Sequence, residues 1–410
     1  MAPIIDMSVK KDKNKRGLIR ELYFSRMLSC ADLCDKMDKS LPLITKLVNE
    51  LIEENKIVER GLAASTGGRR PVMYSIREDV NYIVAVSMDQ LITRITLLNM
   101  HNEFIGEMVK VDLPLKGNDD ALSILTQAIG TFVQNSLIPK EKIIGIGIAM
   151  PGFIDAQKGI NYSFLKTNRS ITHFISKALE LPVFIDNDSS LIALAELRFG
   201  AAIAEKNVMV INMGWGVGLG MILDGALYRG EIGFAGEFSH IPLFNNNKLC
   251  SCGKQGCLET ETSLLVLVEN AKKGLQAGRI SCLQNVPLDA PEEANKMIIQ
   301  AALEGDQFAI ELLSDIGLIV GRGVAILIHL LNPKLIVLSG RGAMAGRIWK
   351  APIQQALTEY CIPRLVHNTE IKVSALGHQA EMIGAAALVM ENIERLKPTK
   401  IEIPNYEQVL

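Results

Sequence analysis

GEFSH at residues 236–240, followed by CSCGKQGCLE at residues 250–259, is the stretch that decides the fold of this 410-residue chain. Its metal-binding side chains are one imidazole and three thiols, from His240, Cys250, Cys252 and Cys257. One histidine and three cysteines form a closed tetrahedral ligand set, so we expect a structural rather than a catalytic Zn²⁺. Gly253 and Gly256 allow the loop to fold tightly around a single ion.

The seven cysteines of the chain are spread too unevenly for a disulfide framework. Three lie within residues 250–257, and the others are scattered at Cys30, Cys34, Cys282 and Cys361. In a cytosolic protein a tight cluster favours metal binding over disulfides. Two alternatives remain: the loop holds reduced cysteines without a metal, or His240 is a buried structural residue, although its spacing to the cysteines argues against the second.

Length and composition predict two or three domains with large apolar cores. The chain has 410 residues, of which 48% are hydrophobic. We see no apolar run of the ~20 residues that a membrane helix needs. Residues 1–16 are basic but lack the apolar stretch of a secretory signal. We therefore expect a soluble cytoplasmic protein without a membrane span.

The charge is unevenly distributed along the chain. Residues 1–77 carry 15 Lys and Arg against 10 Asp and Glu, a balance of +5. The remaining residues carry 28 against 35, a balance of −7. A basic head on an acidic body is expected if the head alone meets an acidic polymer such as DNA, but a solvated basic tail explains the charge equally well.

The pattern of residues 1–77 is typical of a winged helix-turn-helix domain. Apolar stripes predict a helix over residues 13–27, a second after Ser29, and a third after Ser40. Two strand-like runs follow, at residues 57–60 and 72–76, joined by a tip that contains Gly-Gly-Arg-Arg-Pro. The alternative is a small helical protein-interaction domain with a basic loop.

In a winged helix the third helix enters the major groove, and the wing reaches phosphates or a narrow minor groove. The predicted DNA-contacting residues are Ser40, Thr45, Lys46, Asn49, Gly68, Arg69 and Arg70. The expected partner is a double-stranded DNA operator.

The body of the chain, from about residue 82, alternates strands and helices in two similar halves. Residues 83–88 and 95–99 predict a hairpin, and residues 208–213 and 217–223 predict a second, glycine-rich hairpin. Buried strands and helices follow each hairpin. Periodicity alone predicts an α/β fold of two lobes.

The motif at residues 236–259 resembles the signature of the ROK family (repressors, open reading frames, kinases): Glu-x-Gly-His, then Cys-x-Cys-Gly-x-x-Gly-Cys-x-Glu. The resemblance extends over nearly the whole chain and implies a winged helix-turn-helix followed by a two-lobed actin-like sugar-kinase fold. The head, residues 1–77, is similar to that of the repressor branch. The first lobe would comprise residues 82–200, with a returning helix at about 380–395, and the second lobe residues 201–380.

The resemblance also implies a sugar site. In ROK kinases an Asn-Asp pair at a strand end binds sugar hydroxyls, and the Asp is the general base. The positions that match the family's sugar contacts are Gly152, Asn187, Asp188, Glu237, His240 and Glu259. Without the resemblance, Asp186-Asn187-Asp188 is typical of a helix N-cap. Ser239 departs from the family pattern, where a glycine is usual, and puts the identity of the ligand in doubt.

The phosphate-binding loops of the kinases are altered here. Where the kinases have Asp-x-Gly-Gly-Thr, this chain has Ser87-Met88-Asp89-Gln90-Leu91, and we expect Asp89 to put a negative charge where ATP phosphates would lie. The second loop, residues 214–220, keeps its glycines but has Trp215 at the usual threonine. Residues 339–342, Ser-Gly-Arg-Gly, retain part of a nucleotide-binding turn.

The sequence therefore predicts a sugar-responsive DNA-binding transcription regulator that is not an enzyme. It is expected to be a repressor of carbohydrate-utilisation genes, modulated by a sugar or sugar phosphate, and a homodimer or homotetramer on its operator. No catalytic residue is assigned, although Asp188 matches the kinase base. The alternatives are an ATP-dependent sugar kinase with an appended DNA-binding domain, and a DNA-binding scaffold controlled by a protein partner.

Overall fold

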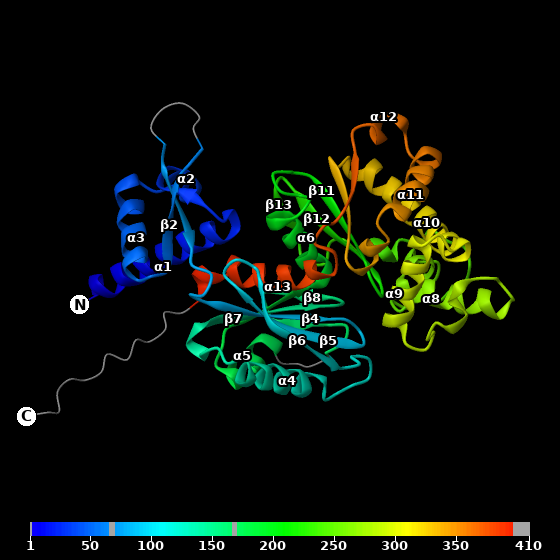
Figure 1. The fold of residues 1–410 in the computed structure, drawn as a ribbon, viewed down its shortest axis with the longest axis horizontal. Coiled ribbons are helices and arrows are strands. Elements are labelled where there is room, and N and C mark those ends of the chain that lie inside the picture. The colour runs from blue at the N-terminus through cyan, green and yellow to red at the C-terminus, as the bar shows by residue number, and fades with distance from the viewer. Residues whose placement is uncertain (1, 65–69, 166–169, 397–410) are drawn as a thin grey trace, which may run out of the picture.

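The N-terminal part of the chain has the winged helix-turn-helix arrangement (Figure 1). In the computed structural model, which describes residues 2–64, 70–165 and 170–396, the first three helices precede a small sheet of order β1-β3-β2. These elements are α1 (Ala2–Ser25), β1 (Leu28–Ser29), α2 (Cys30–Met37), α3 (Leu41–Glu53), β2 (Ile57–Leu62) and β3 (Val72–Ile76). The predicted tip residues Gly68 and Arg69 lie outside the described residues.

Local sequence signals explain where the helices of the head begin. Ser29 and Asp32 form a capping box, in which each side chain accepts a hydrogen bond from the other residue's backbone N–H. Ser40 is the N-cap of α3 without a side-chain cap bond, and Pro42 is tolerated in the first turn. The apolar side of α3 is buried by Ile44, Leu47, Val48 and Leu51.

The first lobe is built on a five-stranded sheet of order β10-β7-β4-β5-β6. Its strands are β4 (Tyr82–Met88), β5 (Ile92–Asn99), β6 (Phe104–Asp112), β7 (Ile143–Met150) and β10 (Val183–Asn187). The predicted hairpin is present as β4 and β5, and β6 extends it by a strand that the sequence analysis omitted. Alternate residues of β4 pack on opposite faces: Val84 and Val86 lie against α4 (Ala121–Asn135) and α5 (Ile171–Leu179), while Ile83 and Ala85 lie on the side of α13 (Ala380–Glu391).

The second lobe has a five-stranded sheet of order β13-β12-β11-β14-β15. Its strands are β11 (Val208–Met213), β12 (Val217–Leu223), β13 (Ala226–Tyr228), β14 (Leu335–Ser339) and β15 (Glu370–Val373). One face packs on α6 (Asp188–Phe199). The other face packs on a helical layer. The remaining helices are α7 (Glu259–Thr262), α8 (Leu264–Gln276), α9 (Pro291–Leu303), α10 (Gln307–Leu331), α11 (Arg347–Tyr360) and α12 (Pro363–Val366), and a short ribbon pairs β8 (Ile154–Asp155) with β9 (Ile160–Asn161).

Helix α10 is long and apolar enough, by length and composition, to cross a membrane. Its most apolar 18-residue window has a mean hydropathy of 1.7, and 61% of that window is buried inside the protein. The buried side packs with α11, where Gly317 lies against Pro352 and Gly321 against Ala356. Core packing thus accounts for the apolar character of this helix.

Helices α6 and α13 pack against each other between the two sheets (Figure 1). The contact is close because Gly384 of α13 has no side chain: a Cβ there would lie 2.0 Å from the carbonyl oxygen of Leu191 in α6. Gly147 of β7 makes a similar approach, since its Cβ would lie 1.9 Å from the carbonyl oxygen of Ala385. The predicted returning helix is thus a central element of the body.

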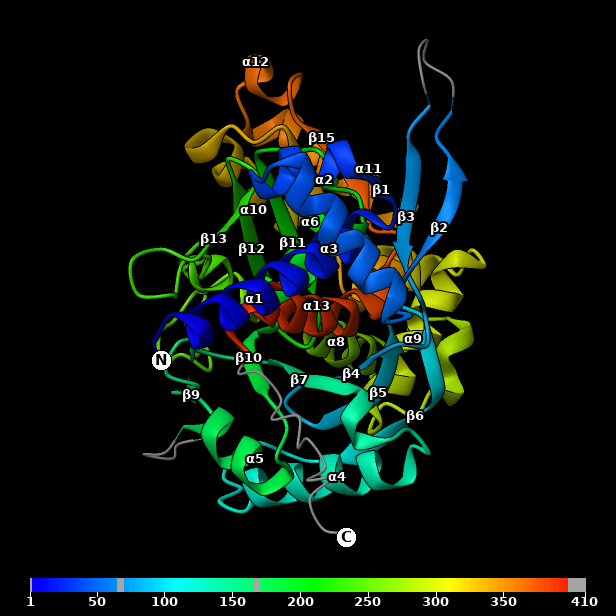
Figure 2. The same ribbon diagram turned by 90° about the vertical axis from the view of Figure 1, so that its left-hand side faces the viewer.

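The head packs onto the ends of these two helices. Figure 2 shows α1 beside α13, and α1 also contacts η6 (Ile393–Arg395), which follows α13. The rings of Tyr23 and Phe24 of α1 pack against Phe199, the last residue of α6. Tyr23 meets it edge to face at a centroid distance of 5.7 Å, and Phe24 meets it at a tilt at 5.9 Å. Arg20 pairs with Glu394 of η6. Head and body therefore share one continuous apolar core.

Candidate functional site

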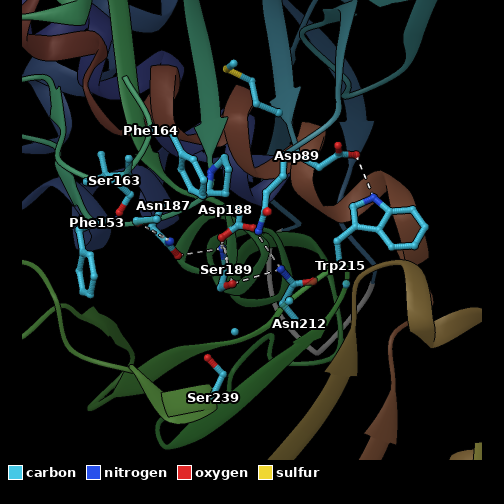
Figure 3. A pocket seen from close by; sticks show the side chains of 18 of the residues that line it. Asp89, Phe153, Ser163, Phe164, Asn187, Asp188, Ser189, Asn212, Trp215 and Ser239 are labelled. Carbon is cyan, nitrogen blue, oxygen red and sulfur yellow. Dashed lines mark hydrogen bonds between the residues drawn. The ribbon is translucent and has the colours of Figure 1, made fainter. Parts of the chain in front are cut away.

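A cavity of about 900 Å³ opens between the loops of the two lobes (Figure 3). Its lining contains every residue predicted to contact a sugar: Gly152, Asn187, Asp188, Glu237, His240 and Glu259. The fold thus brings together residues from the loop after β7, from β10 and α6, from η2 (Phe238–His240) and its N-cap, and from α7, which are up to 107 positions apart in the chain.

Asn187 and Asp188 form the junction between β10 and α6. Asn187 is the N-cap of α6: its side-chain oxygen accepts from the backbone N–H groups of Ser189 (2.9 Å) and Ser190 (3.2 Å). Its amide nitrogen donates to the carbonyl oxygen of Gly152 (3.1 Å). Both functional groups of Asn187 therefore hold the backbone of the site, as the N-cap interpretation of this motif requires.

The two carboxylate oxygens of Asp188 have different surroundings: one is hydrogen-bonded within the first turn of α6, and the other faces the cavity. Oδ1 accepts from the backbone N–H of Ser189 (2.7 Å) and from its hydroxyl (3.1 Å). The contact of Oδ2 is a long one of 3.5 Å from Asn212 Nδ2. Burial raises the pKa of Asp188 to about 6, and the nearby Glu237 and Asp89 add to this shift. Oδ2 is thus placed to accept a hydrogen bond from a sugar hydroxyl.

Asp186, the first residue of this motif, has a different role. Its carboxylate is buried and receives two hydrogen bonds from Arg229, of 2.6 and 3.1 Å. It does not line the cavity among the residues described there. Asp186 is a structural residue that ties β10 to the segment after β13.

The four predicted metal ligands lie together. The ligand atoms of His240, Cys250, Cys252 and Cys257 are all within 4.8 Å of one another. Cys252 Sγ and Cys257 Sγ are 3.7 Å apart, and Cys250 Sγ lies 3.5 Å from His240 Nδ1. A tetrahedron with metal–sulfur bonds of about 2.3 Å and metal–nitrogen bonds of about 2.0 Å requires sulfur–sulfur separations of about 3.8 Å and sulfur–nitrogen separations of about 3.5 Å. The residues therefore fit a tetrahedral metal ion.

The cluster also borders the cavity. His240 uses Nδ1 toward the cysteines, and its Nε2 lies 3.6 Å from the Glu237 carboxylate. Glu259 accepts hydrogen bonds from Ser251 Oγ (3.2 Å) and Cys250 Sγ (3.7 Å). Contacts of this kind orient metal ligands and their neighbours, so an ordered loop would also position Glu237 and Glu259.

On the other side of Asp188, an ion-pair cluster is built around Asp89, which belongs to the altered first loop. Figure 3 shows Asp89 and Trp215 on this side, with Asn187 and Phe153 opposite. Asp89 Oδ2 accepts from Arg94 (2.9 Å), Arg341 (2.8 Å) and Trp215 Nε1 (3.3 Å). Asp89 Oδ1 accepts from two backbone N–H groups of its own turn. We name Asp89, Arg94, Trp215, Glu292 and Arg341 the interlobe cluster.

Glu292 completes the interlobe cluster from α9. It pairs with Arg94 (2.6 Å) and lies 3.9 Å from Arg341, and the opposite charges lower its pKa to about 2 against the effect of burial. Asp89 and Arg94 belong to the first lobe, whereas the other members belong to the second. The expected negative charge at Asp89 is therefore present, but two guanidinium groups neutralise it and join the lobes.

The glycines of the second and third loops have packing roles within this chain. A Cβ at Gly218 would lie 1.9 Å from Ser189 Oγ, and one at Gly220 would lie 2.3 Å from the Cβ of Ala193, because β12 packs tightly on α6. At Gly340, where φ is +76°, a Cβ would lie 2.2 Å from Asn212 Oδ1. These glycines are therefore required without any nucleotide.

Glu381 is a member of the cavity that the sequence analysis missed. It is the second residue of α13 and lines the cavity beside Asp188. Burial, and next the charge of Asp188, raise its pKa to about 7. Its approach to the site depends on the return of the chain to the first lobe. Nothing in the sequence indicated that Glu381 reaches the cavity, apart from the apolar run that follows Glu381 in α13.

The predicted DNA-contacting side of α3 is exposed. Ser40, Thr45, Lys46 and Asn49 are all exposed and lie opposite the buried face of the helix. Glu50, at the edge of this side, is held by Lys11 and Lys15 of α1 at 2.8 Å each. Arg70 is exposed at the base of the wing, where its Nε donates to the carbonyl oxygen of Ala63 (2.6 Å).

Comparison with known proteins agrees with the fold and with the motifs. The chain is 28% identical to the xylose repressor of Caldicellulosiruptor bescii, over 93% of this chain and 96% of the repressor. It is 32% identical to a glucokinase of Halalkalibacterium halodurans, over 70% of this chain and 89% of the kinase.

The crystal structure of a ROK family transcriptional regulator, a homolog of the E. coli MLC protein, superposes with a TM-score of 0.75 at 28% identity. This alignment covers 94% of this chain and 97% of that one. Residues 101–392 match the ROK family profile. The chain therefore belongs to the ROK family.

Proposed function

We propose that the chain is a sugar-responsive transcription repressor that binds an operator through its winged head. The repressors to which it is similar match over head and body, whereas the glucokinase matches over 70% of the chain. In this proposal the head is residues 1–77, the first lobe residues 82–200 with the returning helix at about 380–395, and the second lobe residues 201–380. The carbohydrate-utilisation genes are its targets.

The observation that carries this proposal is the division of the cavity. One side has acceptors for hydroxyls, with Asp188 Oδ2, Glu237 and Glu259 facing the same space. The other side carries the interlobe cluster, in which Asp89 and Trp215 replace the residues of the kinase phosphate loops, and we infer that it no longer binds a nucleotide. In this proposal the sugar binds in the cavity without being phosphorylated, so its binding acts as a signal. Asp188 then accepts a hydrogen bond from a sugar hydroxyl and catalyses no step.

Two helices supply the physical route from the cavity to the head. Asp188 begins α6 and Glu381 is in the first turn of α13, and both helices end at the contacts with α1. Each has 12 residues and is about 18 Å long. Sugar binding that closes the lobes would shift these helices together. It would thereby move the head, with a coupling of about 1–3 kcal/mol.

The cysteine cluster fits Zn²⁺ best among the common metals, since three thiolates and one imidazole in a tetrahedron are its preferred structural ligands. When bound, the ion would hold residues 240–257 and, through His240 and the Ser251 hydroxyl, keep Glu237 and Glu259 in place. Its role is structural, because the four side chains fill its coordination shell.

The head supports DNA binding by its exposed polar helix face and its charge. Ser40, Thr45, Lys46 and Asn49 would reach base edges, while Gly68, Arg69 and Arg70 of the wing would reach phosphates or the minor groove. Because Lys11 and Lys15 neutralise Glu50, repulsion of the DNA backbone by this carboxylate is reduced. A homodimer or homotetramer in the cytoplasm would present two heads to a palindromic operator.

The test combines selection of DNA with a sugar screen. The full chain should enrich one duplex motif from a random library, and at least one sugar should change its affinity for that motif. Failure to enrich any motif, or an affinity that no sugar changes, would refute the proposal. Phosphorylation of a sugar by ATP that is abolished in Asp188→Asn would establish the kinase alternative.

A further inference from the structure

We propose that the effector is an unphosphorylated sugar, because the cavity has carboxylates where a phosphorylated sugar would need free cations. This inference rests on the proposed function, since it names the class of ligand for the same cavity. It separates two classes of effector, the sugar and its phosphate ester. In the ester one hydroxyl is replaced by a phosphate, which adds about two negative charges.

The charges that line the cavity are predominantly negative. Among the described lining residues, the acidic ones are Asp89, Asp119, Asp188, Glu237, Glu259 and Glu381, and the basic ones are Lys116 and Arg341. Lys116 and Asp119 are exposed and oppose each other in charge at the rim. The inner wall therefore presents five carboxyl groups against the single guanidinium of Arg341.

Arg341 is already committed to other partners. Its guanidinium is 2.8 Å from Asp89 Oδ2 and 3.9 Å from Glu292 Oε1, and it lies 5.7 Å from the centre of the Trp215 ring. Arg94, whose side chain is 8% exposed, is paired with the same two acids at 2.9 and 2.6 Å. A phosphate would have to break these pairs before either arginine could bind it.

His378, which lines the same side of the cavity, does not supply a positive charge in place of Arg94 and Arg341. Burial lowers the pKa of His378, and the positive charges of Arg341, Lys296 and Arg94 lower it further. The imidazole is therefore neutral at physiological pH. The imidazole of His240 belongs to the group of candidate metal ligands, with its Nδ1 directed at Cys250.

The position of Asp188 decides where a phosphate would go. A phosphate on the hydroxyl that faces Asp188 would lie close to the carboxyl groups of Asp188 and Glu381, which both line the cavity. These carboxyls already repel one another, since the charge of Asp188 helps to raise the pKa of Glu381. One like charge at ~5 Å in an environment of effective dielectric constant ~20 lowers a binding constant roughly 100-fold. A neutral sugar instead donates its hydroxyls to the same oxygens.

The experiment uses the full chain and sugars that differ by one phosphate. Calorimetric titrations at pH 7.5 compare glucose with its 6- and 1-phosphates, N-acetylglucosamine with its 6-phosphate, and xylose with its 1-phosphate. In each pair that binds, we expect the parent sugar to bind at least about 100-fold more tightly. A phosphate ester that binds as tightly as its parent overturns the inference while leaving the proposed function intact. Absence of binding by every compound removes the effector site and this inference together.

Two variants test the cause of the discrimination. Asp89→Ser removes one carboxylate and leaves Arg94 and Arg341 to share Glu292, so the ratio between parent and phosphate should fall at least tenfold. Because this change also breaks buried ion pairs, Glu381→Gln provides a second test: it removes a carboxyl without breaking an ion pair and should lower the ratio in the same direction. Asp289→Asn, at a carboxylate that is 94% exposed, is the control and should leave the ratio unchanged. A wild-type ratio in both cavity variants contradicts the inference.

Discussion

The interlobe cluster makes Asp89→Asn a sharp test of how the two lobes are joined. The change preserves size and removes one charge. Asp89 Oδ1 accepts from the N–H groups of Leu91 (2.8 Å) and Ile92 (2.7 Å), and Oδ2 accepts from three side chains. The amide of asparagine has only one oxygen. It can accept from the two backbone N–H groups or from the three side-chain donors, but at the other position its NH₂ group would face donors.

The structure sets the size of the effect. The side chain of Asp89 is 12% exposed, and those of Arg94 and Arg341 are 8% and 19% exposed, so solvent screens the pairs weakly. Removing one partner from a buried ion pair costs about 3–5 kcal/mol. Glu292 still pairs with Arg94 and lies near Arg341 after the change, so the cost should be at the lower end of this range. We expect the free energy of unfolding to fall by about 3 kcal/mol.

Urea unfolding followed by tryptophan fluorescence measures this change, since Trp215 is itself part of the interlobe cluster. With a slope of about 3 kcal/mol per molar urea, the transition midpoint should fall by about 1 M. Asp289→Asn is the matched control, because it breaks an exposed pair with Lys272, and exposed pairs contribute little. An Asp89→Asn protein that unfolds at the wild-type midpoint would refute the reasoning.

Four further outcomes follow from the same contacts. Cys252→Ser should abolish stoichiometric zinc, measured by mass spectrometry, and lower sugar affinity, whereas Cys282→Ser, away from the cluster, should change neither. Phe199→Ala, which removes the ring against Tyr23 and Phe24, should leave sugar affinity within about threefold and reduce the sugar's effect on DNA affinity; unchanged coupling contradicts the α6 route. Folding shifts the pKa of Glu381 up from 4.5 to about 7, so its contribution to stability is complete below about pH 4.5 and is lost as pH rises through 7. Glu381→Gln should therefore gain thermal stability relative to wild type between pH 5 and 8, and a constant difference would disprove the shift. Lys46→Ala should weaken operator binding and lower its salt dependence, measured by fluorescence anisotropy at several salt concentrations.

Features encoded by short-range spacing could be predicted from the sequence. The four metal ligands lie within residues 240–257, so the glycines and cysteines of one loop bring three of them together. The helices and strands of the head were predictable because Ser29 carries its capping signal locally and α3 has a clear apolar stripe. The β4–β5 hairpin was predictable from its run of buried residues.

The alternation of apolar and polar residues does not predict which charged residues, distant in the sequence, form ion pairs. Asp89 and Arg341 are 252 positions apart, and Arg94 and Glu292 are 198 apart. From the sequence, Asp89 was expected to repel phosphates as an isolated charge. In the structure it is a neutralised link between lobes. The glycines at residues 214–220 suggested a phosphate loop, but the packing of β12 on α6 explains Gly218 and Gly220.

The sequence by itself determined the family, the cluster of candidate metal ligands and the head, because motifs and capping signals act over a few residues and can be read without knowledge of the fold. Only the tertiary structure decided the electrostatics of the cavity. It brings Glu381 beside Asp188 through the return of α13, and it pairs Asp89 with Arg341 and Arg94 with Glu292 across the lobes. The energy of a charge depends on its burial and on its partners in space, and neither is encoded by proximity along the chain.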